Sequence, residues 1–237
     1  MPALNLEVCL TPALLHLHDI RESIVVVIDI FRATSSICYG IENGATAIIP
    51  VESIAACETY RESNYLLAAE RNGEVVEGFD FGNSPFAYTS EKVNGKTIVL
   101  TTTNGTHAIH QSRAAHQVVI GSFLNLNVLS NWLKIQERNI CLLCSGWNDK
   151  TNLEDTLFAG AVVSNLRDAD YKLDDAGILA ADLYTLAKDD LREYLKKSSH
   201  SERLKKLRIE EDIAFCLRQN ITQSIPVLRG IELVKLD

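Results

Sequence analysis

The chain has 237 residues, of which 46% are hydrophobic and 23% charged, and it carries a formal net charge of −8 at neutral pH. These shares are those of an ordinary globular protein, and no apolar run approaches the roughly 18 residues of a membrane span. The N-terminal segment lacks the basic start and long apolar stretch of a signal peptide. The excess of negative charge argues against nucleic acid as a partner. We therefore expect a cytoplasmic protein that binds neither membranes nor nucleic acids.

Most of the six cysteines lie inside apolar runs, as buried free thiols do: Cys9, Cys38, Cys57, Cys141, Cys144 and Cys216. Cys141 and Cys144 have the spacing of a redox pair, but residues i and i+3 of an extended chain point to opposite faces. We predict structural thiols in a reducing compartment, and a dithiol switch is the alternative.

Strand-like and helix-like runs alternate along the first two thirds of the chain. In chain order the predicted elements are a strand at 24–29, a helix at 33–42, a strand at 47–51, a helix at 53–61, strands at 66–70 and 97–102, a helix at 106–112, a strand at 118–121, a helix at 126–137, a strand at 140–144 and a helix at 152–166. After residue 172 helices predominate, at 174–187, 189–197, 201–207 and 210–217, and a strand pair is predicted within 226–234.

This alternation predicts an α/β protein with three layers, α/β/α, around a largely parallel or mixed sheet, and with extra helices near the C-terminus. We expect residues 1–237 to form a single α/β domain. The alternative is two lobes with a boundary near residues 120–170.

Polar side chains follow most of the predicted strands, where such sheets bind ligands. The residues at these strand ends and in the loops that follow are Asp29, Arg32, Thr34, Glu70, Arg71, Asp80, Asn83, Ser84, Thr101, Thr102, Thr103, Asn104, Gly105, Thr106, Cys144, Ser145 and Gly146. Acids, arginines and hydroxyl groups would thus converge on one edge of the sheet. A purely structural role explains each residue singly, but it explains their coincidence at one edge poorly.

Individual residues at this edge keep alternative interpretations. Asp29 is either a cap of the next turn or a metal ligand or catalytic carboxylate. Asn104-Gly105 readily adopts positive φ, so this turn either forms an anion cradle with its threonines or simply joins a strand to a helix. Arg32 and Arg71 either bind an anion through their planar forks or form solvated surface pairs.

Several known motifs are absent. Phe31 stands where haloacid-dehalogenase-type phosphatases have a second Asp, and Lys150 stands where a Cys144-based tyrosine phosphatase would need Arg. There is neither a P-loop nor a Gly-x-Gly-x-x-Gly fingerprint. The six histidines show no zinc spacing.

Five blocks in a fixed order resemble the 2-phosphosulfolactate phosphatase family. They are Ile28-Asp29-Ile-Phe-Arg32-Ala33-Thr34-Ser35, Ala68-Ala-Glu70-Arg71-Asn-Gly73, Gly78-Phe-Asp80-Phe-Gly82-Asn83-Ser84-Pro85, Thr101-Thr-Thr-Asn104-Gly105-Thr106, and Leu153-Glu154-Asp155 with Ala159-Gly160. The likeness continues more loosely through Asp212-Ile-Ala-Phe-Cys216. The resemblance implies a Mg²⁺-dependent acid phosphatase with an α/β fold that converts 2-phospho-3-sulfolactate to 3-sulfolactate and phosphate in coenzyme M biosynthesis.

With this resemblance the site residues receive expected roles. The candidate Mg²⁺ ligands are Asp29, Glu70, Asp80 and Asp155, of which Asp29, Glu70 and Asp155 are also the candidate catalytic residues. The expected substrate-binding residues are Arg32, Thr34, Arg71, Asn83, Ser84, Thr103, Asn104, Gly105, Thr106, Cys144, Ser145 and Gly146. We expect Arg32 to bind the phosphate and Arg71 the remote anion.

The expected partner is a small anionic phosphoester, and a homodimer is an open alternative to a monomer. Two other functions stay open: a phosphatase for another small phosphoester, and a protein that binds a phosphometabolite without turnover. A cluster of acids facing a phosphate makes little sense without a metal, which favours the enzyme.

Overall fold

The computed structural model describes residues 4–71, 73–199 and 210–237, so the helix predicted at 201–207 lies outside the described residues. The strands are β1 (Leu4–Cys9), β2 (Ser23–Ile28), β3 (Ala47–Pro50), β4 (Leu66–Arg71), β5 (Glu74–Val75), β6 (Thr97–Thr101), β7 (Gln117–Gly121), β8 (Asn139–Cys144), β9 (Tyr171–Leu173), β10 (Pro226–Arg229) and β11 (Glu232–Lys235). The α-helices are α1 (Ala33–Glu42), α2 (Ile54–Glu58), α3 (Ser90–Val93), α4 (Gly105–Gln111), α5 (Leu126–Lys134), α6 (Leu153–Asn165), α7 (Asp175–Ala187), α8 (Leu191–Leu195) and α10 (Glu210–Cys216). Short 3₁₀ turns are η1 (Pro12–Leu17), η2 (Pro85–Ala87), η3 (Ser112–Ala114) and η4 (Phe123–Asn125).

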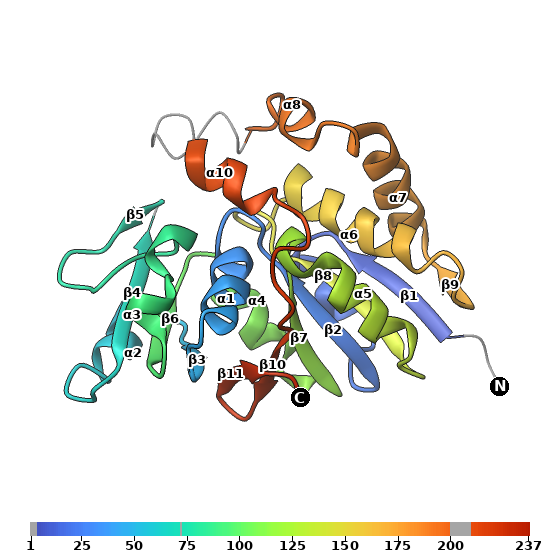
Figure 1. Cartoon of the computed structure of the whole chain (residues 1–237). Helices are drawn as coiled ribbons and strands as arrows, with labels where there is room; N and C mark the ends of the chain where they lie inside the picture. The colour runs from blue at the N-terminus through green and yellow to red at the C-terminus, as the bar shows by residue number, and fades with distance from the viewer. Residues whose placement is uncertain (1–3, 72, 200–209) are drawn as a thin grey trace.

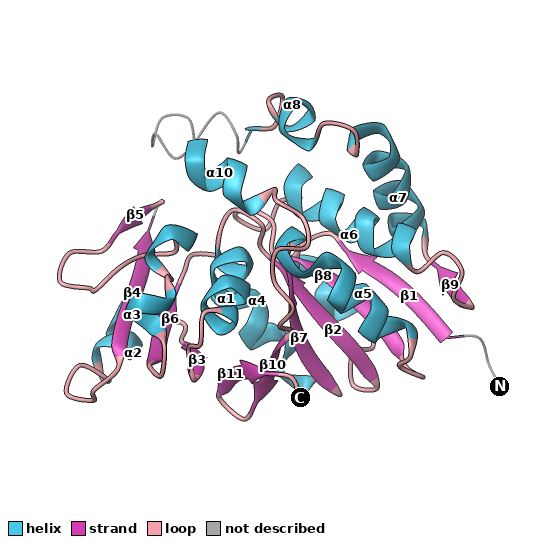
Figure 2. Cartoon of the chain, in the orientation of Figure 1, coloured by secondary structure: helices cyan, strands magenta, loops and turns pink. Residues whose placement is uncertain are grey.

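The described strands form one mixed sheet in the order β5-β4-β6-β3-β11-β10-β7-β2-β8-β1-β9. Strands β4, β6 and β3 are parallel to one another, and so are β7, β2, β8, β1 and β9. The hairpin β10–β11 is antiparallel and joins the two parallel groups, pairing with β7 on one side and β3 on the other (Figure 2). The predicted strand pair at 226–234 is therefore confirmed, and it lies inside the sheet.

Helices cover both faces of the sheet, and the apolar side chains of β2 point alternately to one face and the other. Ile24, Val26 and Ile28 enter an apolar core shared with α5 and α6, whereas Val25 and Val27 enter a second core shared with α1 and α4. Successive side chains of a strand point to opposite faces, and helices cover both faces here, so every residue of β2 is buried. The predicted three-layer α/β/α arrangement is confirmed (Figure 1).

Two of the strands that the sequence analysis missed lie at one edge of the sheet. β1 alternates polar Asn5 and Glu7 with apolar Leu6 and Val8, so it carries the weaker signal of a strand buried mainly on one face. β9 has three residues, too few to give a periodic pattern. The predicted helix at 53–61 is confirmed only as the shorter α2, which Ser53 caps by accepting a hydrogen bond from the Ala56 amide.

The cysteines behave as predicted. All six are buried and free of disulfides. The Cys141 side chain lies in the core beneath α1 and α4 and the Cys144 side chain in the core beneath α5 and α6, on opposite faces of β8. This separation excludes a Cys141–Cys144 disulfide in this fold.

Among the described residues, no helix is both long and apolar enough to cross a membrane.

Candidate active site

A small cleft gathers residues from the ends of four strands. Its lining consists of Asp29, Phe31 and Arg32 after β2, Glu70 and Gly73 at the end of β4, Asn83, Asn104 after β6, and Trp147 after β8. Five of these residues were expected from the sequence: Asp29, Arg32, Glu70, Asn83 and Asn104. The predicted convergence at one edge of the sheet is thus found for β2, β4, β6 and β8.

Asp29 is held by the first turn of α1. Its amide donates a hydrogen bond to the Thr34 hydroxyl (3.0 Å), and the Thr34 amide donates to the Asp29 carbonyl (3.0 Å). Thr34 is fully buried and therefore positions Asp29 without lining the cleft. Gly105 lies directly against this carboxylate, because a Cβ at that position would come within 2.7 Å of the Asp29 Oδ2 atom. Only glycine permits this approach between α4 and Asp29.

The turn from β6 to α4 differs from its prediction. Asn104 has φ −118°, and Gly105 is not among the residues with positive φ. Thr102 and Thr106 bond to each other, since each hydroxyl accepts from the other residue's amide and the Thr106 hydroxyl donates to the Thr102 carbonyl. The hydroxyls of Thr102 and Thr106 are used within the turn. Asn104 is the residue of this turn that lines the cleft.

Glu70 and Arg71 are neighbours in β4 and therefore point to opposite faces. Glu70 is buried in the cleft, where its carboxylate accepts a hydrogen bond from the Gly73 amide. The Arg71 guanidinium instead donates to the Thr101 hydroxyl (3.0 Å) and to the Glu70 carbonyl (2.6 Å). The structure does not place Arg71 in the cleft lining, contrary to the expectation that it binds a substrate anion there.

Arg32 is buried and is held from two sides. Its guanidinium donates to the Asp212 carboxylate of α10 and to the Gly73 carbonyl (2.7 Å). The other Asp212 oxygen accepts from the Ser84 hydroxyl (2.8 Å). Ser84, expected as a substrate ligand, thus contacts Asp212.

Asp155 is fully buried at the start of α6 and is not part of the cleft lining. Its carboxylate accepts hydrogen bonds from the Ile30 amide (2.9 Å), the Gly146 amide (3.0 Å) and the Asn152 side chain (3.0 Å). Burial raises the pKa of Asp155 well above its usual value, and the negative charge of Asp29 raises it further. Asp155 therefore ties the loops after β2 and β8 together.

The loop after β8 turns tightly. Gly146 has φ 60°, and a Cβ there would lie 2.3 Å from the Lys150 carbonyl oxygen. Asn148 and Asp149 also have positive φ, and the Trp147 amide donates to the Lys150 carbonyl (2.8 Å). This turn places Trp147 at the cleft.

The expected thiol and hydroxyl ligands of this loop lie deeper in the molecule. Cys144 is fully buried in the apolar core, and burial raises the pKa of its thiol well above its usual value. A thiolate nucleophile is disfavoured there.

Three buried polar atoms near this edge have no hydrogen-bond partner among the described residues: Asn83 Oδ1, Thr103 Oγ1 and Ser145 Oγ. Of these, Asn83 lines the cleft. A buried unpaired oxygen is costly, and a ligand that satisfies it removes the cost. Asn83 Oδ1 is thus a candidate oxygen donor to a cation.

Asp80 lies apart from the other acids. Its side chain is exposed, and its carboxylate accepts a hydrogen bond from the Leu67 amide (2.7 Å) near the start of β4. The structure does not bring Asp80 to the cleft, although it was expected as a metal ligand.

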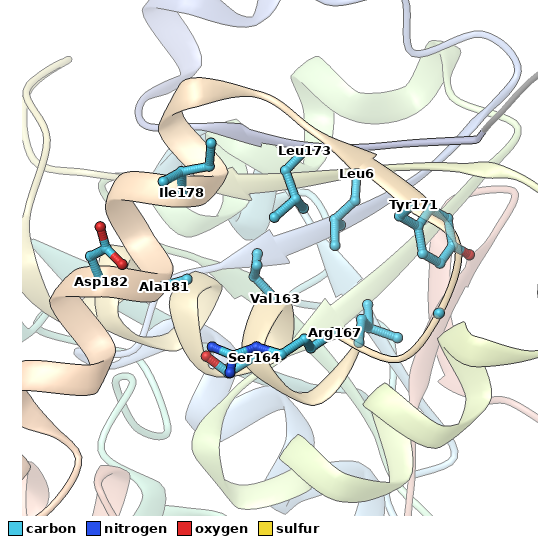
Figure 3. A pocket seen from close by; sticks show the side chains of 11 residues that line it. Leu6, Val163, Ser164, Arg167, Tyr171, Leu173, Ile178, Ala181 and Asp182 are labelled. Carbon is cyan, nitrogen blue, oxygen red and sulfur yellow. The ribbon is translucent and has the colours of Figure 1, made fainter.

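A second, more apolar hollow lies between β1, α6, β9 and α7 (Figure 3). Leu6, Val163, Leu173 and Ile178 contribute much of its wall. It holds one carboxylate, Asp182, and one guanidinium, Arg167, whereas the smaller cleft gathers two carboxylates with Arg32 at the strand ends, so we assign the site to that cleft.

The sequence analysis missed four residues of this region as site residues. Phe31, Gly73 and Trp147 line the cleft, and Asp212 contacts Arg32. Phe31 and Trp147 each follow within three residues of a strand end, which is the signal that could have found them. Nothing local marks Asp212, because its partner Arg32 is 180 positions away.

Comparison with known proteins shows the family to which the chain belongs. The sequence profile described as 2-phosphosulpholactate phosphatase matches residues 9–230. A Thermotoga petrophila protein named "Probable 2-phosphosulfolactate phosphatase" is 44% identical over 89% of this chain and 91% of its own length. Proteins of the same name from Caldanaerobacter subterraneus (38% identity, 90% of each chain) and Gloeobacter violaceus (38% identity, 85% of this chain and 86% of the relative) are also similar. The chain therefore belongs to the 2-phosphosulfolactate phosphatase family and is a phosphoric monoester hydrolase.

Proposed function

We propose that this chain hydrolyses 2-phospho-3-sulfolactate to 3-sulfolactate and phosphate in a reaction that depends on Mg²⁺, the step that serves coenzyme M biosynthesis. The observation that carries the proposal is a cleft lined by Asp29, Glu70 and Arg32 in a chain of this family. The names of the similar proteins support the choice of substrate.

The charge of the cleft supports a cation as cofactor. Asp29 and Glu70 are both buried in its wall, and the charge of Arg32 is already opposed by Asp212. The substrate would bring about four negative charges near neutral pH. Two like unit charges 4 Å apart repel by roughly 4 kcal/mol at an effective dielectric constant of 20. A polyanion would therefore be rejected unless a cation compensates the two carboxylates.

The donor set fits Mg²⁺. Within residues 4–71, 73–199 and 210–237, no three His, Cys, Asp or Glu side chains form a metal-binding cluster of their own. Mg²⁺ commonly uses one or two carboxylates and completes its shell with water and substrate phosphate oxygens. Asp29 and Glu70 would supply the carboxylates, and the unpaired Asn83 Oδ1 would supply a third oxygen. When bound, the ion would supply Lewis-acid polarisation of the phosphoryl group.

The chain's own groups complete the site. Arg32 would bind phosphoryl oxygens through the N–H groups that Asp212 and Gly73 do not use, and the side chain of Asn104, which also lines the cleft, would donate a hydrogen bond. The rings of Phe31 and Trp147 would limit the access of bulk water, which strengthens electrostatic contacts within the cleft. One of the two cleft carboxylates could accept the proton of the attacking water.

The test is phosphate release from three esters: 2-phosphosulfolactate, phospholactate, which lacks the sulfonate, and 4-nitrophenyl phosphate. Each is measured with Mg²⁺ and after chelation by EDTA. We expect EDTA to abolish turnover, added Mg²⁺ to restore it, and kcat/KM to be highest for 2-phosphosulfolactate. Full activity after chelation would refute the metal requirement, and equal kcat/KM for the first two esters would refute the substrate assignment.

A pair of variants locates the metal. Asp29→Asn should raise the Mg²⁺ concentration needed for half-maximal activity, whereas Asp168→Asn, at an exposed position outside the cleft, should not. Identical Mg²⁺ requirements in both variants would place the ion elsewhere.

A further inference from the structure

Asp212 joins two segments of the cleft wall that are distant in sequence. It lies in α10, which Figure 1 shows above α1 at the top of the molecule. One carboxylate oxygen accepts from the Arg32 guanidinium and the other accepts from the Ser84 hydroxyl (2.8 Å). The side chains of Arg32 and Asp212 are only 5% and 8% exposed, so solvent screens this ion pair little.

The orientation of Arg32 depends on these contacts. An arginine side chain has four rotatable bonds, and without fixed partners its guanidinium would sample many directions. Asp212 binds one end nitrogen and the Gly73 carbonyl binds the other (2.7 Å), which fixes the plane of the guanidinium. Arg32 lines the cleft in this fixed orientation.

Attachment of α10 does not require the carboxylate. Phe215 packs its ring against Tyr39 (centroids 4.9 Å apart) and Phe86 (5.2 Å), and Cys216 is fully buried. A buried ion pair contributes little net stability compared with apolar contacts, because both charges lose their hydration. The role of Asp212 can therefore be separated from the docking of its helix.

We infer that Asp212 is a positioning residue, which aims the guanidinium of Arg32 at the phosphoryl group of the substrate. The inference rests on the proposed function, because it takes the cleft to bind a phosphoryl group. In this role Asp212 acts through Arg32 and not through its contact with Ser84, so its effect on catalysis should vanish when Arg32 is absent.

The experiment is a double-mutant cycle on the full chain with 4-nitrophenyl phosphate as substrate. Asp212→Asn should lower kcat/KM by about 10- to 100-fold, the usual effect of losing a charge-assisted contact. Glu211→Gln, an exposed acid on the same helix, is the matched control and should stay within about twofold. In an Arg32→Ala background, Asp212→Asn should have no further effect.

A second readout is chemical rescue. Guanidinium ion added to the Arg32→Ala protein should restore part of the turnover, and it should restore much less in Arg32→Ala/Asp212→Asn because the carboxylate that holds it is gone. Asp212→Glu, which keeps the charge, should recover part of the wild-type kcat/KM. Circular dichroism at the assay temperature verifies that each variant is folded, and Asp212→Glu replaces Asp212→Asn in the cycle if the latter does not fold.

Two outcomes would overturn the inference: wild-type kinetics in Asp212→Asn, or the same fold-loss from Asp212→Asn with and without Arg32. A wild-type protein that releases phosphate from no ester would instead count against the proposed function. The inference would then be judged by calorimetric binding of inorganic phosphate. Weaker binding by Asp212→Asn than by Glu211→Gln would support it, and equal binding would overturn it.

Discussion

Gly105→Ala should damage the active site more than the fold. The new Cβ would lie 2.6 Å from the Ala33 Cβ and 2.7 Å from the Asp29 Oδ2 atom. Carbon atoms normally approach to about 3.5–4.0 Å, so α4 and the start of α1 would have to separate by about 1 Å. Overpacking of this kind costs about 1–3 kcal/mol. For a chain of this length that corresponds to a lowering of Tm by roughly 2–12 °C.

The effect on catalysis should be larger than this loss of stability suggests. A displacement of about 1 Å at a catalytic group can cost on the order of 100-fold in rate. Gly40→Ala is the matched control, because its Cβ would lie 2.9 Å from the Tyr88 ring, away from the cleft carboxylates. Both variants are compared by thermal unfolding and by kcat for phosphate release well below Tm.

We expect a similar fall of Tm in both variants and a fall of kcat in Gly105→Ala alone. If Gly105→Ala kept kcat within about twofold of wild type while Tm fell as in the control, the contact with Asp29 would not be part of the catalytic geometry.

Four further substitutions test the assignments. Cys144→Ser should keep at least about a tenth of the wild-type kcat, a cost below ~1.4 kcal/mol in activation free energy, because the Cys144 thiol is buried and its pKa is raised. A loss of kcat beyond about a thousandfold in a folded variant would indicate a cysteine nucleophile. Arg32→Lys should lower kcat by about one to two decades through loss of the planar fork. Arg71→Lys should lower kcat clearly less, since Arg71 does not line the cleft. Equal losses of kcat in the two variants would contradict this placement of the arginines. Asp155→Asn should lower the free energy of unfolding by about 1–3 kcal/mol, because an amide would set an N–H group among three donors. Urea unfolding measures this loss against Asp168→Asn, and equal losses would show that the three hydrogen bonds contribute nothing.

Local patterns predicted those parts of the fold that local interactions determine. The short, β-branched apolar run at residues 24–29 predicted a strand buried on both faces, and β2 is such a strand. The N-cap of α6 was also predictable, since the Asn152 side chain accepts from the Asp155 amide as its position suggested. The rule that ligands lie at the carboxyl ends of strands then placed Asp29, Glu70 and Asn104 correctly at one edge.

The rest depended on side-chain direction and on contacts between distant segments. Glu70 and Arg71 are adjacent charged residues at the end of the same strand, and the sequence does not distinguish them as site residues. The pleat of β4 directs only the Glu70 side chain into the cleft. Asp80 resembles the other acids in type, but its carboxylate is bonded to the Leu67 amide. The pairing of Asp212 with Arg32 arises only when the whole chain has folded.

The position of the β10–β11 hairpin has a consequence for the order in which the molecule forms. The hairpin follows every other described strand in the chain, yet it joins the two parallel groups. It pairs with each group through a single residue pair, Val227 with Val119 of β7 and Leu233 with Ile48 of β3. During synthesis the ribosome would release both groups before the hairpin emerged, so each would present an open sheet edge to other chains. Asp29 follows a strand of one group, and Glu70 lies in a strand of the other. A nascent chain would therefore bring these two carboxylates together late, and it would be most prone to aggregate in the interval before the hairpin joins the groups.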